Sequence, residues 1–432
     1  MGYRFSKFVT IIKKDGLGNA IKKVYLYIRA KYLSRVNFLG FLKIKLNNKK
    51  IRKDIDALLE KDYDRIILWR SSFGWNVPLF QRPQHIARFL SQKKCLIFYE
   101  ITTVTDKVRT YKKIEDNLIL VNFNNRAMQR LLLEEIRKYD KPKYIQFYST
   151  DATLSVKDLD NFVDDGYKII YEYIDDINPK LLGMNELPAN ITEKYERMME
   201  DTENTFVVVT ADALEKDVLD RRGKEKIVFA CNGVDYDHFA KLDKEIKLDN
   251  KFLKIIDENK PIVGYYGALA NWFDYEMVKK LAKERPDYNI VLLGIKYDGS
   301  FDEANLEEYP NIYFLGPKKY DELPYYASKF SICTIPFLVN DITQATSPLK
   351  LFEYMALGKP IVTTAMKECK KYKSVNIINN SEEFIKTCDK LIEISKEKEN
   401  KYFKLLKSDA MDNTWESKSK LIVNLLREYE NK

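Results

Sequence analysis

The stretch SPLKLFEYMALGKPIVTT, residues 347–364, reads as a helix that leads into a buried strand. Proline suits the first turn of a helix and glycine suits the position after its end, so Pro348 and Gly358 predict a helix over 348–357. The β-branched run that follows Pro360 predicts a short strand. A helix that leads directly into an apolar strand is the repeating unit of a parallel α/β sheet.

The same alternation occurs on both sides of a charged stretch at 241–260. Before that stretch we expect strands at 65–69, 95–100, 118–123, 144–149, 168–174 and 206–210, with helices near 85–92, 125–139, 189–203 and 211–221. After it we expect strands at 261–269, 289–294, 311–316, 332–337 and 360–364, with helices at 277–286, 382–396 and 414–430. This order predicts an α/β chain with two Rossmann-like, doubly wound domains.

Composition narrows the class of protein. The chain has 432 residues, of which 45% are hydrophobic and 32% charged, as in a globular protein. Five cysteines lie far apart without a C-x-x-C, and there are two histidines, so we expect no disulfide framework, no metal site and a cytoplasmic location. Asp-x-Asp triplets at 54–56, 62–64, 158–160 and 235–237 are read as chance in an acid-rich chain. The sequence has no run of 18 apolar residues, so we expect no membrane-spanning helix.

The positive charge is concentrated at the N-terminal end. Residues 1–53 hold 15 Lys and Arg and one acid, Asp15, a balance of +14, so the other 379 residues carry 9 − 14 = −5. Apolar residues at helical spacing over 17–35 lie beside basic ones, and a mixed apolar and basic stretch follows at 37–46. Such a segment favours an anionic membrane surface, and the alternative is a helix that packs on the body with a solvated basic face.

The helix predicted at 348–357 also has the features of an anion site. A helix N-terminus offers free N–H groups and a positive dipole end, to which Ser347 and Lys350 would add a hydroxyl and a cation. Glu353, one turn further on, could accept hydrogen bonds from a vicinal diol such as a ribose. The alternative is a packed helix in which Lys350 and Glu353 form a surface ion pair. No P-loop, G-x-G-x-x-G or G-x-S-x-G motif points to another chemistry.

Six segments together resemble one family. They are QRPQHIARFL (81–90), CNGVDYDHF (231–239), GYYGALANWFDYEMV (264–278), NIYFLGPKKYDELPYY (311–326), PLKLFEYMALGKPIVTT (348–364) and NTWESKSKLIVNLL (413–426). In this order they resemble the family-4, or group 1, glycosyltransferases of GT-B fold, in the bacterial cell-surface polysaccharide branch. The resemblance covers about residues 64–430 and implies two Rossmann-like domains that face a cleft.

The resemblance implies roles for individual residues on the donor side. Glu353 would bind the ribose of a nucleotide-sugar donor, UDP or another nucleotide, and no further cofactor is expected. The other donor-binding positions that it implies are Gly267 and Ala268 at the backbone, Leu315 and Gly316 beside the base, and Ser347, Leu349 and Lys350 along the diphosphate.

The resemblance also implies roles in the N-terminal half. The loop 71–76 would face the cleft, with Gly74 allowing close approach. Asp175 or Asp176 would reach toward the reacting sugar, where the carboxylate would stabilise positive charge on the sugar or deprotonate the acceptor, unless the pair only caps a helix. The positions expected on the acceptor side are Trp75, Asn76 and Phe80, with ordinary packing as the alternative for the two aromatics, and Arg82, which could help Lys350 across the cleft.

Two departures from the family pattern bear on mechanism. The family often has two Glu eight residues apart, and Ala345 stands where the first would be. The loop ALANWFDYE, 268–276, lacks the Arg and Lys that the family tends to place there. Lys350 and the helix N-terminus would then be the main stabilisers of the departing diphosphate, without a metal. The resemblance suggests retention of anomeric configuration.

We therefore predict a basic amphipathic extension at 1–58, an acceptor domain at 59–240, a donor domain at 241–410 and a returning helix at 411–432. The expected function is transfer of a hexosyl or related sugar to a lipid-linked or polysaccharide acceptor in cell-wall or lipopolysaccharide synthesis. The enzyme would be peripheral on the inner face of the plasma membrane, held through 1–53, and would bind no nucleic acid. The alternatives are a non-catalytic GT-B scaffold partner and, less favoured, a sugar-nucleotide 2-epimerase.

Overall fold

A computed structural model describes residues 38–71, 74–77, 80–101, 106–175, 177, 179, 186–243, 245–397 and 401–430. By compactness the chain divides into two units, one of residues 1–77 and 94–145 and one of residues 78–93 and 146–432. These units do not coincide with the predicted domains, whose boundaries stay predictions. The elements form two mostly parallel sheets with helices between their strands, so the predicted α/β class is confirmed.

The N-terminal sheet has eight strands in the order β3-β4-β2-β1-β5-β6-β7-β8. Its strands are β1 (Arg65–Trp69), β2 (Cys95–Glu100), β3 (Tyr111–Glu115), β4 (Leu118–Val121), β5 (Lys143–Tyr148), β6 (Lys168–Tyr173), β7 (Thr205–Val209) and β8 (Ile227–Phe229). The strands β1, β2, β4, β6 and β7 are almost wholly buried, as expected where helices cover both faces of a parallel sheet. The edge strand β3 pairs antiparallel with β4 and is half exposed.

The second sheet has six parallel strands in the order β11-β10-β9-β12-β13-β14. Its strands are β9 (Ile262–Tyr266), β10 (Asn289–Leu293), β11 (Ile312–Phe314), β12 (Ile332–Ile335), β13 (Ile361–Thr364) and β14 (Val375–Ile378). The order reverses direction between β9 and β12, and ligands of open α/β sheets bind at such a switch point, beyond the carboxyl ends of the strands. This sheet lies entirely in the second unit.

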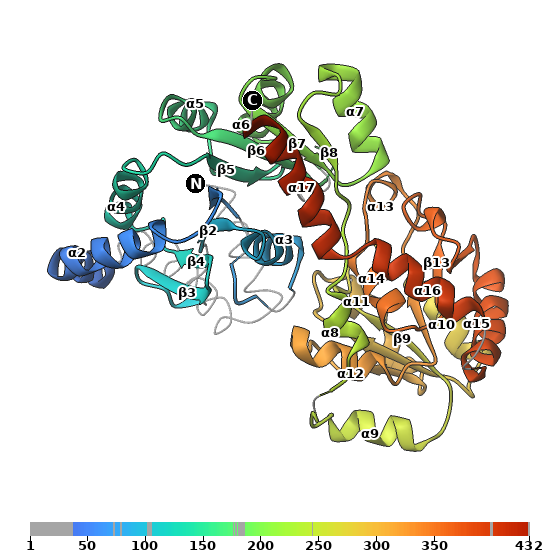
Figure 1. Cartoon of the computed structure of the whole chain (residues 1–432). Helices are drawn as coiled ribbons and strands as arrows, with labels where there is room; N and C mark the ends of the chain where they lie inside the picture. Colours follow the sequence, from blue (N-terminus) through green and yellow to red (C-terminus); the bar gives the residue numbers. More distant parts are fainter. Residues whose placement is uncertain are drawn as a thin grey trace, which may run out of the picture. The chain divides into compact units, whose positions relative to one another are not determined.

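The helices that carry the argument below are α3 (Arg82–Ser91), α6 (Ala189–Glu200), α7 (Asp212–Arg222), α8 (Tyr236–Ala240), α13 (Asp341–Gln344), α14 (Leu349–Ala356), α16 (Lys401–Asp412) and α17 (Trp415–Glu430). α17 packs against α3 and β8, as Figure 1 shows. At the start of α17 the chain passes very close to Gly233, where a Cβ would lie 2.8 Å from the carbonyl oxygen of Asn413. Only glycine fits this crossing.

The helix predicted at 17–35 lies outside the described residues. The stretch that begins the described chain forms α2 (Phe38–Leu59), which is kinked at Asn47 and packs against α4 (Arg126–Ile136). Two large apolar side chains on α2 are exposed, Phe41 by 51% and Leu46 by 80%. In the part of the chain that the structure describes, no helix is both long enough and apolar enough to cross a membrane.

Candidate functional site

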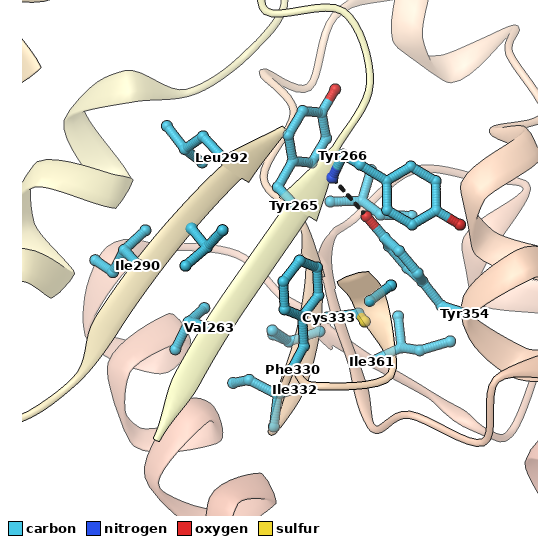
Figure 2. Close-up of a cluster of buried hydrophobic side chains, with 14 of the residues drawn as sticks. Val263, Tyr265, Tyr266, Ile290, Leu292, Phe330, Ile332, Cys333, Tyr354 and Ile361 are labelled. Atoms are coloured by element: carbon cyan, nitrogen blue, oxygen red, sulfur yellow. Dashed lines mark hydrogen bonds between the residues drawn. The ribbon is translucent and has the colours of Figure 1, made fainter. Parts of the chain in front are cut away.

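The helix α14 is held by a buried apolar face. Pro348 precedes it, and Leu351, Phe352 and Met355 are at most 1% exposed. The hydroxyl of Tyr354 accepts a hydrogen bond from the backbone N–H of Tyr266 at 3.0 Å, which Figure 2 shows within the apolar cluster at the end of β9. This bond fixes the rotation of α14 about its axis relative to β9, and so it fixes which of its side chains face that strand end.

Glu353 is buried on α14 and has one identified partner. Its exposed fraction is 6%, and its Oε2 accepts a hydrogen bond from the hydroxyl of Tyr266 at 2.8 Å. Burial raises the pKa of Glu353 to about 7, against the lowering effects of the Tyr266 hydroxyl and of Lys350. The carboxyl is therefore poised to change charge near neutral pH, which marks it as a functional candidate rather than a solvated surface acid.

Lys350 lies one turn before Glu353 and is held by aromatic rings. Its Nζ lies 5.0 Å from the ring centroid of Phe337 and 5.5 Å from that of Tyr265. Burial lowers the pKa of Lys350 to about 8, against the raising effect of Glu353. Among the described residues Lys350 forms no ion pair within 4.0 Å, so the alternative of a Lys350–Glu353 surface ion pair is wrong. A cation whose identified contacts are ring faces keeps its charge available for a ligand.

The chain that enters α14 carries two unpartnered polar atoms. The side-chain N–H of Asn232 donates to the carbonyl oxygen of Ser347 at 2.6 Å. Within the described part of the chain, Ser347 Oγ and Asn232 Oδ1 are buried without a hydrogen-bond partner. Because buried polar atoms are rarely left unpaired, these two call for a ligand or ordered water at the start of α14.

The glycines of the donor half lie at the carboxyl ends of neighbouring strands. Gly267 follows β9 with φ +145°, and a Cβ there would lie 2.8 Å from Lys350 Cε and 2.8 Å from the Tyr265 hydroxyl. Gly294 follows the neighbouring strand β10, and its N–H donates to the carbonyl oxygen of Gly316 at 2.9 Å. The carbonyl oxygen of Ala268 accepts a hydrogen bond from the hydroxyl of Tyr265 at 2.8 Å, which holds the backbone of this turn.

The structure thus brings several predicted donor residues to one strand end. Gly267 lies against Lys350, and Tyr266 links β9 to Glu353. The two positions beside the expected base, Leu315 and Gly316, follow β11 at the same edge of the sheet, where Leu315 N–H donates to the carbonyl of Leu292 at 3.0 Å. Leu349 is partly exposed at the first turn of α14. Their roles toward a donor stay predictions.

The loop residues predicted in the first unit are held by one acid. Asp106 is buried and accepts from the backbone N–H of Trp75 at 3.1 Å and from that of Asn76 at 2.6 Å. Trp75 is 8% exposed and packs edge-on against Tyr99 at 5.3 Å between ring centroids, whereas Asn76 is exposed. Gly74 is buried beside them. Packing therefore accounts for Trp75, and a role in acceptor binding stays a prediction for this loop.

Arg82 is placed inside the second unit rather than on its surface. It is 4% exposed, and its guanidinium contacts Glu172 Oε2 at 2.9 Å and the carbonyl of Cys231 at 3.2 Å. Phe80, just before α3, stacks on Tyr320 at 5.1 Å between ring centroids. Both residues are thus used to join α3 to neighbouring segments of the same unit, which is a structural use of residues predicted for the acceptor side.

The predicted acid pair is described at one of its two positions. Asp175 follows β6, is partly exposed, and its backbone carbonyl accepts from the hydroxyl of Ser149 at 3.3 Å. It does not cap α6, whose N-cap is Pro188. Asp176 lies outside the described residues. A catalytic role for either acid stays a prediction.

Two residues of the site were not among those predicted from the sequence, Tyr266 and Asn232. Tyr266 is the last residue of β9 and precedes Gly267, and Asn232 follows β8 within the CNGVD segment. Their positions at strand ends could have suggested them. Across the described ranges, no three His, Cys, Asp or Glu side chains form a group that could hold a metal ion.

A part of the chain that includes α14 is similar in sequence to known proteins. Residues 260–393 match the family model of the glycosyl transferases group 1. Over 197 residues the chain is 30% identical to TuaH of Bacillus subtilis (strain 168), whose name describes a glycosyltransferase of teichuronic acid biosynthesis. That match covers 43% of this chain and 48% of the relative, so the chain spans about half the length of the curated relative it matches.

Solved structures share the fold at low sequence identity. Sucrose-phosphate synthase from Thermosynechococcus elongatus has a TM-score of 0.61 at 12% identity and covers 85% of this chain and 99% of its own. Anabaena HepE, solved with UDP and glucose, has a TM-score of 0.58 at 12% identity, with 85% and 100% covered. An E. coli trehalose-6-phosphate structure bound with UDP-2-fluoro glucose has a TM-score of 0.61 at 12% identity, with 84% and 98% covered.

These structures have the GT-B fold, which confirms the fold expected from the sequence. The family model coincides with the part of the chain that contains β9 to β14 and α14. Residues 260–393 therefore match the glycosyl transferases group 1 family, and the chain that contains them has the GT-B fold.

Proposed function

We propose that the protein transfers a sugar from a nucleotide-sugar donor and that α14 holds the nucleotide. The observation that carries this proposal is the buried Glu353, fixed by the Tyr266 hydroxyl one turn beyond an open helix N-terminus. A carboxylate held in this way can accept hydrogen bonds from a ribose diol. Two structural neighbours were solved with UDP or a UDP-sugar, which supports a nucleotide sugar as the donor here.

The residues of the site would stabilise the negative charge that forms on the departing diphosphate. When the sugar–phosphate bond breaks, negative charge grows on the diphosphate. The N-terminus of α14 and the Lys350 ammonium would stabilise that charge from preset positions, and such electrostatic stabilisation is commonly the largest catalytic term. Ser347 Oγ, buried and without a partner among the described residues, would donate a hydrogen bond to the same group. In this proposal no metal is needed to offset the charge.

The acceptor would be a glycan or a lipid-linked sugar of the bacterial cell surface. The relative TuaH supports this, since its name places it in teichuronic acid biosynthesis. The balance of +14 over residues 1–53 supports attachment to the anionic inner face of the plasma membrane. Flotation with vesicles that contain phosphatidylglycerol tests the attachment: the full chain should float, and a chain of residues 38–432, which keeps α2 whole, should float less.

Turnover of the donor tests the catalytic part of the proposal. Nucleotide sugars are incubated with the protein, and release of nucleoside diphosphate is followed with and without membrane extract as acceptor source. Wild type should release nucleoside diphosphate, and Lys350→Met should lower the rate at least tenfold. Binding of a nucleotide sugar without any release would contradict transfer and favour the non-catalytic scaffold partner.

A further inference from the structure

Tyr320 carries a buried hydroxyl that the chain leaves without a partner. It is the first residue of the 3-10 helix η4 (Tyr320–Glu322), in the part of the chain that matches the family model. Among the described residues, its hydroxyl oxygen is buried and forms no hydrogen bond. Such a hydroxyl has lost its hydrogen bonds to water and gained none, which costs stability. A partner from outside the chain would remove this cost.

The ring of Tyr320 is fixed by aromatic neighbours. It stacks on His238 of α8, at 4.4 Å between ring centroids and 7° between ring planes, and on Phe80, at 5.1 Å and 30°. His85 of α3 and Phe239 of α8 pack edge-on against it, at 5.1 Å and 5.7 Å. A phenylalanine ring would make the same contacts, so packing accounts for the ring but not for the hydroxyl.

The Tyr320 hydroxyl lies near the residues assigned to the nucleotide. The helix α8, whose His238 stacks on the ring, packs against α14, which carries Glu353. Burial, and then the negative charge of Glu353, raise the pKa of the Tyr320 hydroxyl well above its ordinary value. The hydroxyl is therefore close enough to the Glu353 carboxyl for their charges to interact, although it forms no hydrogen bond to it.

A ribose hydroxyl has the chemistry that this position requires. A hydroxyl group donates one hydrogen bond and also accepts. It can donate to the Glu353 carboxylate, as in the proposed function, and at the same time accept from the Tyr320 hydroxyl. A phosphate oxygen would accept from Tyr320 but would be repelled by the nearby carboxylate. The ribose is therefore favoured over the diphosphate as the partner of Tyr320.

We propose that Tyr320 is a further donor-binding residue, whose hydroxyl donates a hydrogen bond to a ribose hydroxyl that Glu353 also binds. This inference rests on the proposed function, since it concerns the ribose of the same nucleotide. The alternative partner is an ordered water that bridges Tyr320 to His85 Nε2, another buried atom without a partner in the described part of the chain. The two accounts differ in what happens to the free protein when the hydroxyl is removed.

The test removes the hydroxyl and keeps the ring. Tyr320→Phe is compared with wild type and with the control Tyr288→Phe. Tyr288 precedes β10 at the amino end of the second sheet, and its hydroxyl donates to Asp389 Oδ1 at 2.8 Å. Melting temperatures are measured without ligand. Affinities are measured by isothermal titration with UDP, GDP and dTDP, and then with 2′-deoxy and 3′-deoxy forms of those that bind.

Tyr320→Phe should melt no lower than wild type without ligand, whereas Tyr288→Phe should melt lower because Asp389 loses a partner. Tyr320→Phe should bind the nucleoside diphosphate about fivefold more weakly, the effect of one hydrogen bond. It should bind one deoxy form as well as wild type does, because that form lacks the hydroxyl that Tyr320 contacts. Tyr288→Phe should keep the affinities of wild type.

A lower melting temperature for Tyr320→Phe without ligand would show that water already satisfies the hydroxyl, and would overturn the inference. Unchanged affinity for the nucleoside diphosphates would overturn it too. An equal loss of affinity for the parent and both deoxy forms would place the contact elsewhere on the nucleotide, with the same consequence.

The outcomes also separate this inference from the proposed function. If nucleotides bind wild type, Glu353→Ala loses them and Tyr320→Phe does not, then the proposed function stands and the inference about Tyr320 fails. If no nucleotide binds wild type, both fail together.

Discussion

The hydroxyl of Tyr266, at the end of β9, donates a 2.8 Å hydrogen bond to Oε2 of Glu353 on α14. The backbone N–H of the same tyrosine donates to the hydroxyl of Tyr354 one residue further along the helix. One strand residue therefore orients both the acid and the helix that carries it. This pairing explains how a buried carboxyl is held near the open helix N-terminus at Ser347.

Tyr266→Phe should weaken nucleotide-sugar binding about fivefold to tenfold. In the wild type the Tyr266 hydroxyl holds the Glu353 carboxyl and lowers its pKa. Without this hydroxyl the carboxyl becomes less ordered, and its pKa rises, so it is harder to ionise. Isothermal titration from pH 6 to 8 measures the effect, which should be largest at pH 6. Tyr297→Phe, at an exposed tyrosine of the same domain, is the control. Equal affinities for Tyr266→Phe and wild type would show that the hydroxyl has no part in ligand binding.

Glu353 should make the fold less stable as the pH rises. Burial raises its pKa from an ordinary 4.5 to about 7, so the folded state keeps a proton that the unfolded chain has released between these values. The contribution of Glu353 to stability is thus complete below about pH 4.5 and is lost as the pH rises through 7. Urea unfolding of wild type and Glu353→Gln at pH 5 and pH 8 tests this.

Between these two pH values the variant should gain about 2–3 kcal/mol in free energy of unfolding relative to wild type. Because Glu353 raises the pKa of Lys350, the gap between the two proteins also includes the loss of this interaction in Glu353→Gln. The same gap between the proteins at both pH values would mean that Glu353 is ionised throughout and is not desolvated as described.

Gly267→Ala should impair both folding and nucleotide binding. Its φ of +145° is open to glycine, and an added Cβ would lie 2.8 Å from both Lys350 Cε and the Tyr265 hydroxyl. The backbone strain alone costs about 1–3 kcal/mol. Gly358→Ala is the control: its φ is +64° and its Cβ would meet no atom within 4 Å, so it should lose about 1–2 kcal/mol of stability and keep its affinity.

Thermal unfolding and titration with a nucleotide sugar separate the two effects. If Gly267→Ala loses no more affinity than Gly358→Ala, the close approach to Lys350 has no functional meaning.

The buried ion pair of Arg82 and Glu172 should contribute more to the stability of the fold than to substrate binding. Both side chains are at most 4% exposed, so Arg82→Ala would leave Glu172 as a buried acid without its cation, at a cost of about 3–5 kcal/mol. The double variant Arg82→Leu, Glu172→Leu should cost less than Arg82→Ala, because it leaves no buried charge. Urea unfolding checks this order. A single variant as stable as wild type that loses acceptor-dependent turnover would restore the predicted acceptor role of Arg82.

Much of the fold was predictable because buried parallel strands are continuous apolar runs. The strands at 65–69, 95–100 and 289–293 lie where the sequence predicted them, to within a residue. The edge strand β3, YKKIE, was missed because its half-exposed face carries lysines, and β8 because three residues leave no periodicity to read. The helix α9 (Asn250–Asp257) was read as part of a charged linker, although Phe252 and Ile255 bury its one apolar face.

The candidate site was predictable in part. The helix at 349–356 and its polar residues followed from proline, glycine and spacing, and the resemblance supplied their expected roles. Spacing could not show that Glu353 is buried, since an i, i+3 pair of opposite charges is more often a solvated ion pair. The partner that makes the burial tolerable, Tyr266, is 87 residues away in sequence, and such contacts are set by the sheet rather than by local pattern.

The central claim is that Glu353 and its helix bind a nucleotide sugar. The most direct measurement is a thermal-shift titration of wild type, Glu353→Ala and the exposed-site control Glu276→Ala with UDP, GDP, dTDP and their sugars. One nucleotide family should raise the melting temperature of wild type and of the control, and Glu353→Ala should lose the shift. If no nucleotide stabilises wild type, or if Glu353→Ala is stabilised as strongly as wild type, α14 is not the donor site.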